Sequence, residues 1–416
     1  MSFKEWMEVE LGEVILFNPR ENLKKGSIAK KIGMDKLEPF SRKIQGFEET
    51  EFKSGTKFRN GDTLLARITP CLENGKTAQV RILDKNEVGF GSTEFIVLRE
   101  KENKTVNDFI YYLSISKEFR NIAIKSMTGT SGRQRAQKDV LEKTVIRLPL
   151  IEEQKAIANI LSTLDEKIET NNQINKKLEE MAQTIFKHWF VDFEFPNEEG
   201  KPYKSSGGEM VESEMGMIPK GWEVGSLCDL VKEIVTGKTP STKKEENYGT
   251  IYPFITIPDM HGNIFVIKTE RYLSETGNKS QIKKLIPKNS IMVSCIATVG
   301  LVSINLSSAH TNQQINSIVL KKDEDLYYFY EYLKLMNEKL RAIGSTGSTT
   351  LNVNKREFEK IKYIYPTTKV MKKFYGVIKS NFEMVKQRQL ENDVLINTRD
   401  TLLPKLMSGE IRVPLE

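Results

Sequence analysis

Apolar side chains recur three and four positions apart in the middle of the chain, which is the spacing of one face of a long helix. They are Ile157, Leu161, Leu164, Ile168, Leu178, Met181 and Ile185. Pro149 precedes this run, where its missing N–H costs nothing, and two glutamates follow in the expected first turn, where the helix dipole favours acidic groups. Asn171, Asn172 and Asn175 interrupt the apolar seam and can fix the register of a partner helix. The pattern predicts a paired helix over residues 150–190.

The same pattern occurs a second time, with Pro366 lying 217 positions after Pro149. At this offset Ile157 corresponds to Phe374, Leu161 to Ile378, Ile168 to Val385, Leu178 to Leu395 and the mid-helix Asn175 to Asn392. We therefore expect a second long helix within residues 367–416 that pairs antiparallel with the first as a coiled coil. The predicted helix-pairing residues are Ile157, Leu161, Leu164, Ile168, Leu178, Met181, Phe374, Ile378, Val385 and Leu395.

The segments that precede the two helices also repeat, although less closely. "FKEWMEVELGEVI" is similar to "PKGWEVGSLCDLV", and "GSTEFIVLRE" is similar to "TNQQINSIVLKK". Residues 57–68 and 285–297 each combine a turn with an apolar strand, and an aromatic amphipathic helix and a Gly/Ser/Thr loop follow in both halves. The chain is therefore predicted to be α+β, with two pseudo-twofold-related α/β domains joined by two long helices.

The predicted boundaries follow from this repeat. They are a first domain over 1–149, the central helix over 150–190, an exposed linker rich in Pro, Gly and charge over 191–219, a second domain over 220–366, and the distal helix with its tail over 367–416.

Composition narrows the class of protein. The 416 residues contain 38% hydrophobic residues, and no apolar run approaches the ~20 residues of a membrane span. The first residues lack the apolar region of a signal peptide, and the three cysteines, Cys71, Cys228 and Cys295, are far apart and odd in number. We expect a cytoplasmic chain without a disulfide framework. Its net charge of +7 is compatible with nucleic-acid binding and does not prove it.

Two similar domains on paired long helices suggest contact with DNA at two places. A helix of roughly 35 residues spans about 50 Å, and successive turns of duplex DNA come about every 34–36 Å. The loops of both domains carry Lys and Arg, which suit phosphates, and Arg, Gln and Asn, which suit base edges, although charged loops are also often simply solvated. The candidate DNA-binding residues are Arg20, Lys24, Lys25, Lys30, Lys31, Arg67, Arg133, Gln134, Arg135, Lys238, Thr239, Lys243, Lys244, Asn312 and Gln313.

Three motifs resemble one known family, the specificity subunits of type I restriction–modification enzymes. "LPLIEEQKAIANILSTLDEKIETNNQINKKLEEMAQTIFKHWFVDFEFP" resembles the central helix of that family, and "GEMVESEMGMIPKGWEVGSL" resembles the junction into its second target-recognition domain. The ending "LENDVLINTRDTLLPKLMSGEIRV" resembles its distal helix and tail. The resemblance covers essentially the whole chain.

The resemblance implies that each domain recognises one half of a split, asymmetric DNA target through the major groove. It implies that the paired helices set the spacer and dock two modification subunits, which methylate adenine, and that restriction (motor–nuclease) subunits join them. In this family the specificity subunit has no catalytic site. S-adenosylmethionine, ATP and Mg are then expected in the partner subunits, with no cofactor, catalytic residue or metal in this chain.

The residues agree with a binding protein and leave two alternatives open. The closest string to the D/N-P-P-Y/F stretch of adenine methyltransferases is "FNPRE", which lacks the second proline and the aromatic, and no P-loop is present. His188, His261 and His310 lack metal-ligand spacing. The alternatives are a single-chain restriction or methyl-transfer enzyme and a coiled-coil adaptor that binds no DNA.

Overall fold

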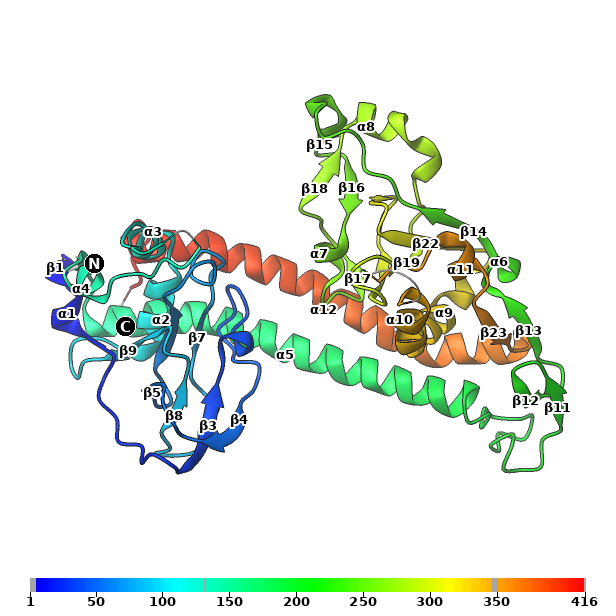
Figure 1. Ribbon diagram of the computed structural model, residues 1–416, viewed down its shortest axis with the longest axis horizontal. Helices are drawn as coiled ribbons and strands as arrows, with labels where there is room; N and C mark the ends of the chain where they lie inside the picture. The colour runs from blue at the N-terminus through cyan, green and yellow to red at the C-terminus, as the bar shows by residue number, and fades with distance from the viewer. Residues whose placement is uncertain (1–4, 131, 346–350, 415–416) are drawn as a thin grey trace. The chain divides into compact units, whose positions relative to one another are not determined.

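The computed structural model describes residues 5–130, 132–345 and 351–414, and the chain falls into two compact units. Unit 1 comprises Met1–Glu169 and Asp393–Glu416, and unit 2 comprises Thr170–Asn392. The two long helices belong to both: α5 (Ile151–Phe190) begins in unit 1 and ends in unit 2, and α12 (Thr368–Ser408) runs from unit 2 into unit 1 (Figure 1).

Unit 1 contains two four-stranded sheets and a two-stranded pair. The central sheet is antiparallel and has the order β2 (Ile15–Phe17), β9 (Phe95–Glu100), β6 (Thr63–Ala66), β7 (Thr77–Gln79). The second sheet has the order β4 (Glu48–Glu51), β3 (Ile28–Ile32), β8 (Gly89–Gly91), β5 (Thr56–Phe58), with β3 and β8 parallel. Strands β1 (Met7–Glu10) and β10 (Val145–Leu148) pair antiparallel.

Five short helices complete the described part of unit 1. They are α1 (Leu11–Val14), the 3₁₀ turn η1 (Met34–Lys36), α2 (Asn107–Ile115), α3 (Lys117–Lys125) and α4 (Lys138–Glu142). Helix α2 is apolar and buried along most of its length, as expected for a helix inside a core, whereas α3 buries only Phe119 and Ala123. In one core cluster, α2 and the central sheet pack with residues from the start of α5 and the end of α12.

Unit 2 repeats this plan with additions. Its central sheet has the order β14 (Val231–Thr236), β22 (Ile315–Leu320), β19 (Ile291–Ser294), β20 (Val302–Asn305), β17 (Phe265–Val266). The second sheet has the order β15 (Tyr248–Gly249), β18 (Arg271–Leu273), β16 (Tyr252–Ile255), β21 (His310–Thr311). Two pairs remain, β13 (Glu223–Ser226) with β23 (Lys362–Tyr365) and the hairpin of β11 (Met210–Ser213) with β12 (Gly216–Pro219).

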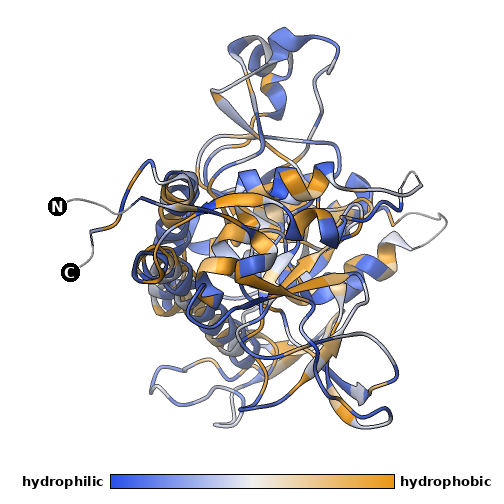
Figure 2. Ribbon diagram, turned by 90° about the vertical axis from the view of Figure 1, so that its left-hand side faces the viewer, coloured by the Kyte–Doolittle hydropathy of each residue, from blue (hydrophilic) through white to orange (hydrophobic). Residues whose placement is uncertain are grey.

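Unit 2 has helices at the places that α1, α2, α3 and α4 occupy in the strand order, with additional short helices between them. The described helices are α6 (Leu227–Leu230), η2 (Glu245–Asn247), α7 (Ile257–Met260), α8 (Glu275–Ser280), η3 (Ile282–Lys284), η4 (Asp323–Asp325), α9 (Leu326–Leu335), α10 (Asn337–Gly344) and α11 (Lys355–Glu359). Helix α8 lies at the tip of a projection that it forms with β15, β16 and β18 (Figure 1). In Figure 2 the strands are largely hydrophobic and many connecting loops hydrophilic, the pattern of cores covered by polar loops.

The predicted internal repeat is confirmed by the strand order. The run β2-β9-β6-β7 of unit 1 corresponds to β14-β22-β19-β20 of unit 2, and the parallel pair β3/β8 corresponds to β16/β21. The terminal pair β1/β10 corresponds to β13/β23. The mixed α and β content, the duplicated domains and the two long helices therefore agree with the predicted fold class.

The long helices run antiparallel inside each unit. In unit 2, Asn171 Nδ2 lies 2.8 Å from Asn392 Oδ1, and the ring centroids of Phe190 and Phe374 are 4.7 Å apart. Residue numbers along α12 therefore fall as those along α5 rise. In unit 1, Asp165 Oδ1 lies 2.7 Å from Arg399 Nη1. The pairing residues Ile157, Leu161, Leu178, Phe374, Ile378 and Val385 are buried, and Leu164, Ile168 and Leu395 are half-buried.

Met181 is the exception among the predicted pairing residues. Its side chain is 53% exposed, so it is not part of the seam. From Leu178 the buried stripe continues in steps of four through Ala182 and Phe186, because a straight helix with 3.6 residues per turn drifts away from a strict heptad.

The predicted linker over residues 191–219 is mostly exposed and also contains anchoring contacts. Phe195 is buried and stacks between Tyr203 and Trp222, with ring centroids 4.5 Å and 4.9 Å away. Ile218 on β12 is buried in the same core cluster. The segment is therefore fastened to unit 2 at two points.

Candidate nucleic-acid interface

The first candidate site lies at one end of the central sheet of unit 1. Arg67 follows β6 and Glu94 precedes β9, and because these strands are antiparallel neighbours the two residues lie side by side, with Arg67 N donating to Glu94 O at 2.9 Å. The loop after α3 crosses this end, since Ala136 N donates to Arg67 O at 2.8 Å and Thr69 N to Gln134 O at 3.0 Å.

Side chains of both signs meet at this place. Arg135 Nε lies 3.0 Å and 2.9 Å from the two Glu94 oxygens, and its Nη2 lies 2.7 Å from Oε1. Arg135 lowers the pKa of the Glu94 carboxyl, and Glu94 raises the pKa of Arg135. Arg67 Nη2 donates to Ala136 O at 3.1 Å, and Arg133 is exposed. Arg67, Glu94, Arg133, Gln134 and Arg135 are termed the sheet-end cluster.

A second basic loop of unit 1 precedes β3 and is anchored by one acidic residue. Arg20, Lys24 and Lys25 are exposed on this loop. Between them, the Glu21 side chain is only 3% exposed, with its oxygens 2.6 Å from Arg99 Nη1 and 2.7 Å from Arg59 Nη2. The buried ion pair therefore holds a loop whose cationic side chains face solvent.

Lys30 and Lys31 lie on β3, away from that loop. Lys30 is 8% exposed, and its amino group lies 2.8 Å from Asp84 and 3.0 Å from Glu87. Lys31 is more exposed and lies 3.5 Å from Glu48. The ammonium groups of both predicted contacts are therefore already paired with carboxylates.

In unit 2, four of the predicted residues come together at the loop that follows β14. Thr239 Oγ1 donates to Gln313 Oε1 at 2.7 Å, and Lys238 N donates to Thr311 O at 2.9 Å. Gly237 is required there, since a Cβ would lie 2.2 Å from Asn312 O. Asn312 itself is 8% exposed and hydrogen-bonds Gln314, so its amide points inward instead of toward a ligand.

Lys243 and Lys244 lie further along the same loop, where both are exposed. The loop is held by Asn247, whose Nδ2 donates to Ser241 O at 3.0 Å.

The position equivalent to the sheet-end cluster has neutral chemistry in unit 2. Cys295 follows β19 as Arg67 follows β6, and its N–H donates to Gln314 O at 2.7 Å as Arg67 donates to Glu94. The bridge between Ile68 and Arg135 corresponds to the bridge between Ile296 and Asn352. Cys295 is buried, which raises the pKa of its thiol to about 12. The triad Arg67, Glu94, Arg135 is thus replaced by Cys295, Gln314, Asn352.

Sequence reasoning found the arginines of this cluster and missed Glu94, Cys295, Gln314 and Asn352. Matching the letters Ile-Val-Leu of the two halves would place Glu94 opposite Asn316, whereas the strand register places it opposite Gln314. One available signal was the offset of 217, which relates Arg135 to Asn352.

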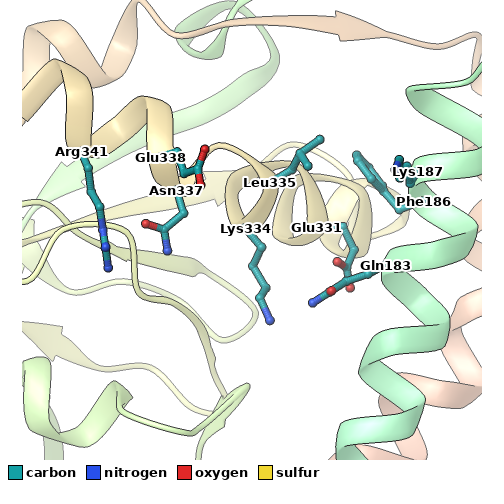
Figure 3. A pocket seen from close by; sticks show the side chains of 9 residues that line it. All are labelled: Gln183, Phe186, Lys187, Glu331, Lys334, Leu335, Asn337, Glu338 and Arg341. Carbon is teal, nitrogen blue, oxygen red and sulfur yellow. The ribbon is translucent and has the colours of Figure 1, made fainter.

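A hollow of about 640 Å³ lies in unit 2 between α5, α9 and α10 (Figure 3). Its lining carries both charges, and none of the predicted DNA-binding residues belongs to it. Glu331 is 2% exposed, its Oε1 has no hydrogen-bond partner, and burial raises its pKa to about 8. Lys334 beside it forms an ion pair with Glu179, while burial lowers the pKa of Lys334 to about 8.

The histidines make no metal site. His310 is fully buried, with its ring nitrogens 2.9 Å from Asn278 and 3.3 Å from Gln281, and burial lowers its pKa to about 4. Within residues 5–130, 132–345 and 351–414, no three His, Cys, Asp or Glu residues are grouped so that they could hold a metal ion. The helices in these ranges also include none that is long and apolar enough to cross a membrane.

Comparison with known proteins identifies the family. The sequence model of the type I restriction modification DNA specificity domain matches this chain twice, over residues 3–180 and 219–390. The chain belongs to this family.

Members of the family match over most of the chain. The HindI type I restriction enzyme specificity subunit of Haemophilus influenzae is 36% identical over 409 residues, which cover 85% of this chain and 87% of the relative. The MjaIX specificity subunit of Methanocaldococcus jannaschii is 30% identical over 316 residues, which cover 74% of this chain and 70% of the relative.

A solved structure of the family has the same fold. The crystal structure of the type I restriction–modification system S subunit from M. genitalium superimposes with a TM-score of 0.57 over 97% of this chain and 96% of that chain, at 18% identity. At this identity the similarity concerns the fold alone. The two family matches fall on the two repeated halves and include both sets of DNA-binding candidates.

Proposed function

We propose that this chain is the DNA-specificity subunit of a type I restriction–modification complex, in which each unit recognises one half of a split, asymmetric DNA target. The observation that carries the proposal is the repetition of one strand order with different side chains at equivalent loops. A duplicated scaffold supports two recognition sites, and different side chains at those sites support two different half-sites.

The basic loops would supply the contacts to DNA in two ways. Exposed lysines such as Lys24, Lys25, Lys243 and Lys244 suit phosphates, which position the protein without recognising sequence. Planar or amide side chains at the sheet ends, such as Arg135 in unit 1 and Gln313 in unit 2, suit base edges in the major groove.

The paired helices would set the number of unspecified base pairs that separate the half-sites. Antiparallel contacts between the two helices inside each unit support this role, because helices paired in a defined register can act as a spacer. A change of whole heptads within residues 161–178 should therefore alter the spacer and leave both half-sites intact.

The chemistry would belong to partner subunits in the cytoplasm. Two modification subunits would carry S-adenosylmethionine and methylate adenine N6, and restriction subunits would use ATP and Mg. The sequence supports this division, because it contains neither a D/N-P-P-Y/F stretch nor a P-loop.

The test is to co-express the chain with its modification partner and to map methylated adenines across a host genome. Two short half-sites with a fixed gap, present only with this chain, are the expected result. A continuous motif, or methylation that does not depend on the chain, would contradict the proposal and favour the coiled-coil adaptor that binds no DNA. Methylation by the isolated chain would instead indicate a single-chain enzyme.

A further inference from the structure

We infer that Glu94 positions Arg135 as a guanine-recognising side chain, so that the two residues together determine one base pair of the half-site bound by unit 1. The inference rests on the proposed function and adds to it a residue with a defined base preference. Glu94 would be the positioning residue and Arg135 the residue that touches DNA.

The geometry of the ion pair leaves one edge of Arg135 available. The Nε and Nη2 edge of the guanidinium faces Glu94, with contacts of 2.7–3.0 Å to both carboxylate oxygens. Among the described residues, the other edge, formed by Nη1 and the second hydrogen of Nη2, makes only a contact of 3.5 Å from Nη1 to Arg133 O. The Arg135 side chain is 42% exposed. A free edge with two parallel donors matches the O6 and N7 acceptors of guanine in the major groove.

The backbone of Arg135 is held as firmly as its side chain. Its N–H donates to Thr128 O at 2.9 Å, and its C=O accepts from Thr128 N at 3.1 Å. The neighbouring Gln134 O accepts from Thr69 N, which ties this turn to the end of β6. Both the position and the plane of the guanidinium are therefore set before DNA binds, as bidentate recognition requires.

Two other roles for the pair fit these contacts less well. A phosphate contact depends on positive charge, and Glu94 offsets the charge of Arg135 at 2.7 Å. Glu94 could in principle accept from cytosine N4, but both of its oxygens are already bound by Arg135.

The equivalent place in unit 2 provides an internal comparison. Asn352 stands where Arg135 stands, and Gln314 stands where Glu94 stands. Gln314 Oε1 accepts from Asn312 Nδ2 at 2.9 Å. At this sheet end, a guanidinium bound by a carboxylate is present in unit 1 and is replaced by amide side chains in unit 2. The effect of changing the pair should therefore be confined to one half-site.

The experiment compares E94Q, R135K and the wild-type chain, each co-expressed with the modification subunit, by genome-wide mapping of methylated adenines. We expect a G·C pair at one position of one half-site in the wild type. Both variants should relax that same position, with an about 10- to 100-fold loss of discrimination there in binding assays on duplexes carrying each of the four base pairs. The spacer and the other half-site should stay unchanged.

Controls separate base recognition from folding and from general affinity. E142Q removes a partner of the Lys138–Glu142 ion pair on the neighbouring helix α4 and should leave the motif intact. R135K keeps the positive charge and approximate size of the side chain but loses the planar fork. Co-purification of each variant with the modification subunit shows whether that variant folds.

Three results would overturn the inference. One is an unchanged motif in both variants that fold, and another is relaxation at an A·T pair. The third is an equal loss of affinity for all four base pairs at that position, which would make Arg135 a contact that does not recognise sequence. The absence of any split motif in the wild type would contradict the proposed function itself, so the two failures are distinguishable.

Discussion

Units 1 and 2 share a strand order and differ in the side chains through which α5 and α12 contact each other inside each unit. In unit 2 the contact is aromatic: Phe374 packs against Phe186, Trp189 and Phe190, with ring centroids 4.7–6.0 Å apart. In unit 1 the two helices contribute aliphatic side chains, such as Leu161 and Leu403, to one core cluster, and Asp165 and Arg399 form an ion pair whose side chains are 9% and 10% exposed. Strand pairing can thus be conserved while the side-chain chemistry between the two helices differs.

The same contrast recurs at the sheet ends. Unit 1 places a carboxylate between arginines where unit 2 has a thiol and two amides. Further along β9, Arg99 of unit 1 binds Asp62 at 2.6 Å and is only 20% exposed, whereas the equivalent residue of unit 2 in the strand register is the buried Val319. Unit 1 should therefore be the more sensitive to removal of a charge, and unit 2 to removal of an aromatic ring.

The largest expected effect is the loss of an aromatic ring in unit 2. Phe374→Ala should destabilise unit 2 by about 3–5 kcal/mol, because the truncation leaves a cavity among three aromatic neighbours. Hydrogen exchange measured by mass spectrometry reports each unit separately, so faster exchange should be confined to unit 2 peptides. Val377→Ala, at a position 47% exposed on the same helix, is the control and should change exchange little. Equal loss of protection in both units would contradict the comparison.

The next largest effect is expected when a buried charge of unit 1, that of Asp165, is removed. Asp165→Asn removes one of the two carboxylates that bind the buried Arg399, the other being Asp400 at 2.8 Å, and weakens the hydrogen bond from Tyr112 Oη, which is 2.7 Å long. We expect a loss of about 3 kcal/mol, confined to unit 1.

A double-mutant cycle of D165N with R399M checks that the ion pair is the cause. The coupling between the two changes should be about 1–3 kcal/mol, because the second change removes the guanidinium that lost its buried partner in the first. Additive losses would show that the residues act separately.

The hollow of unit 2 should make stability depend on pH. Burial raises the pKa of Glu331 in the folded protein to about 8, above its ordinary 4.5, so the folded state holds this proton more tightly than the unfolded state. The stabilisation is complete below the unfolded pKa and is lost as pH rises toward 8. Between pH 5 and 7.5, unit 2 of the wild type should lose more stability than that of E331Q, by on the order of 1 kcal/mol or more.

The charged and titratable groups around Glu331 limit the pH range in which its own titration can be observed. Its charged and titratable surroundings are Lys187, Lys334, Glu338, Arg341, Tyr330 and Glu179. Burial lowers the pKa of Lys334 to about 8, so its contribution changes mainly above the window. Parallel pH profiles for E331Q and the wild type would show that Glu331 does not titrate in this range.

The smallest effect is expected from the exposed lysines of the two basic loops. K24A/K25A in unit 1 and K243A/K244A in unit 2 should each weaken binding of the complex to its DNA target several-fold. Each pair should also reduce the slope of log K against log salt by up to about 2, because up to two phosphate contacts are lost. K117A/K125A on α3 removes the same charge from another exposed surface and is the matched control. A slope equal to that of the control would mean that the loop does not touch phosphate.

The hydrophobic periodicity and the internal repeat of the sequence by themselves predict the two long helices and the duplicated domains. The spacing of Ile157, Leu161 and Leu178 predicted a long paired helix, and the offset of 217 predicted its repetition, because helix period and burial leave their signature in consecutive residues. The charged loops were also visible, since Lys and Arg in irregular segments are evident from the sequence itself.

Only the tertiary structure decided which of these charges are available and what surrounds them. Lys30 is paired with Asp84 and Glu87, which lie far away in sequence, whereas Asn312 is buried and bonded to Gln314 and Met181 lies outside the helix seam. The meeting of Glu94 with Arg135, 41 positions later, depends on strand register and on a loop that crosses the sheet end. Local sequence determines the elements, whereas contacts between distant residues determine which side chains can face DNA.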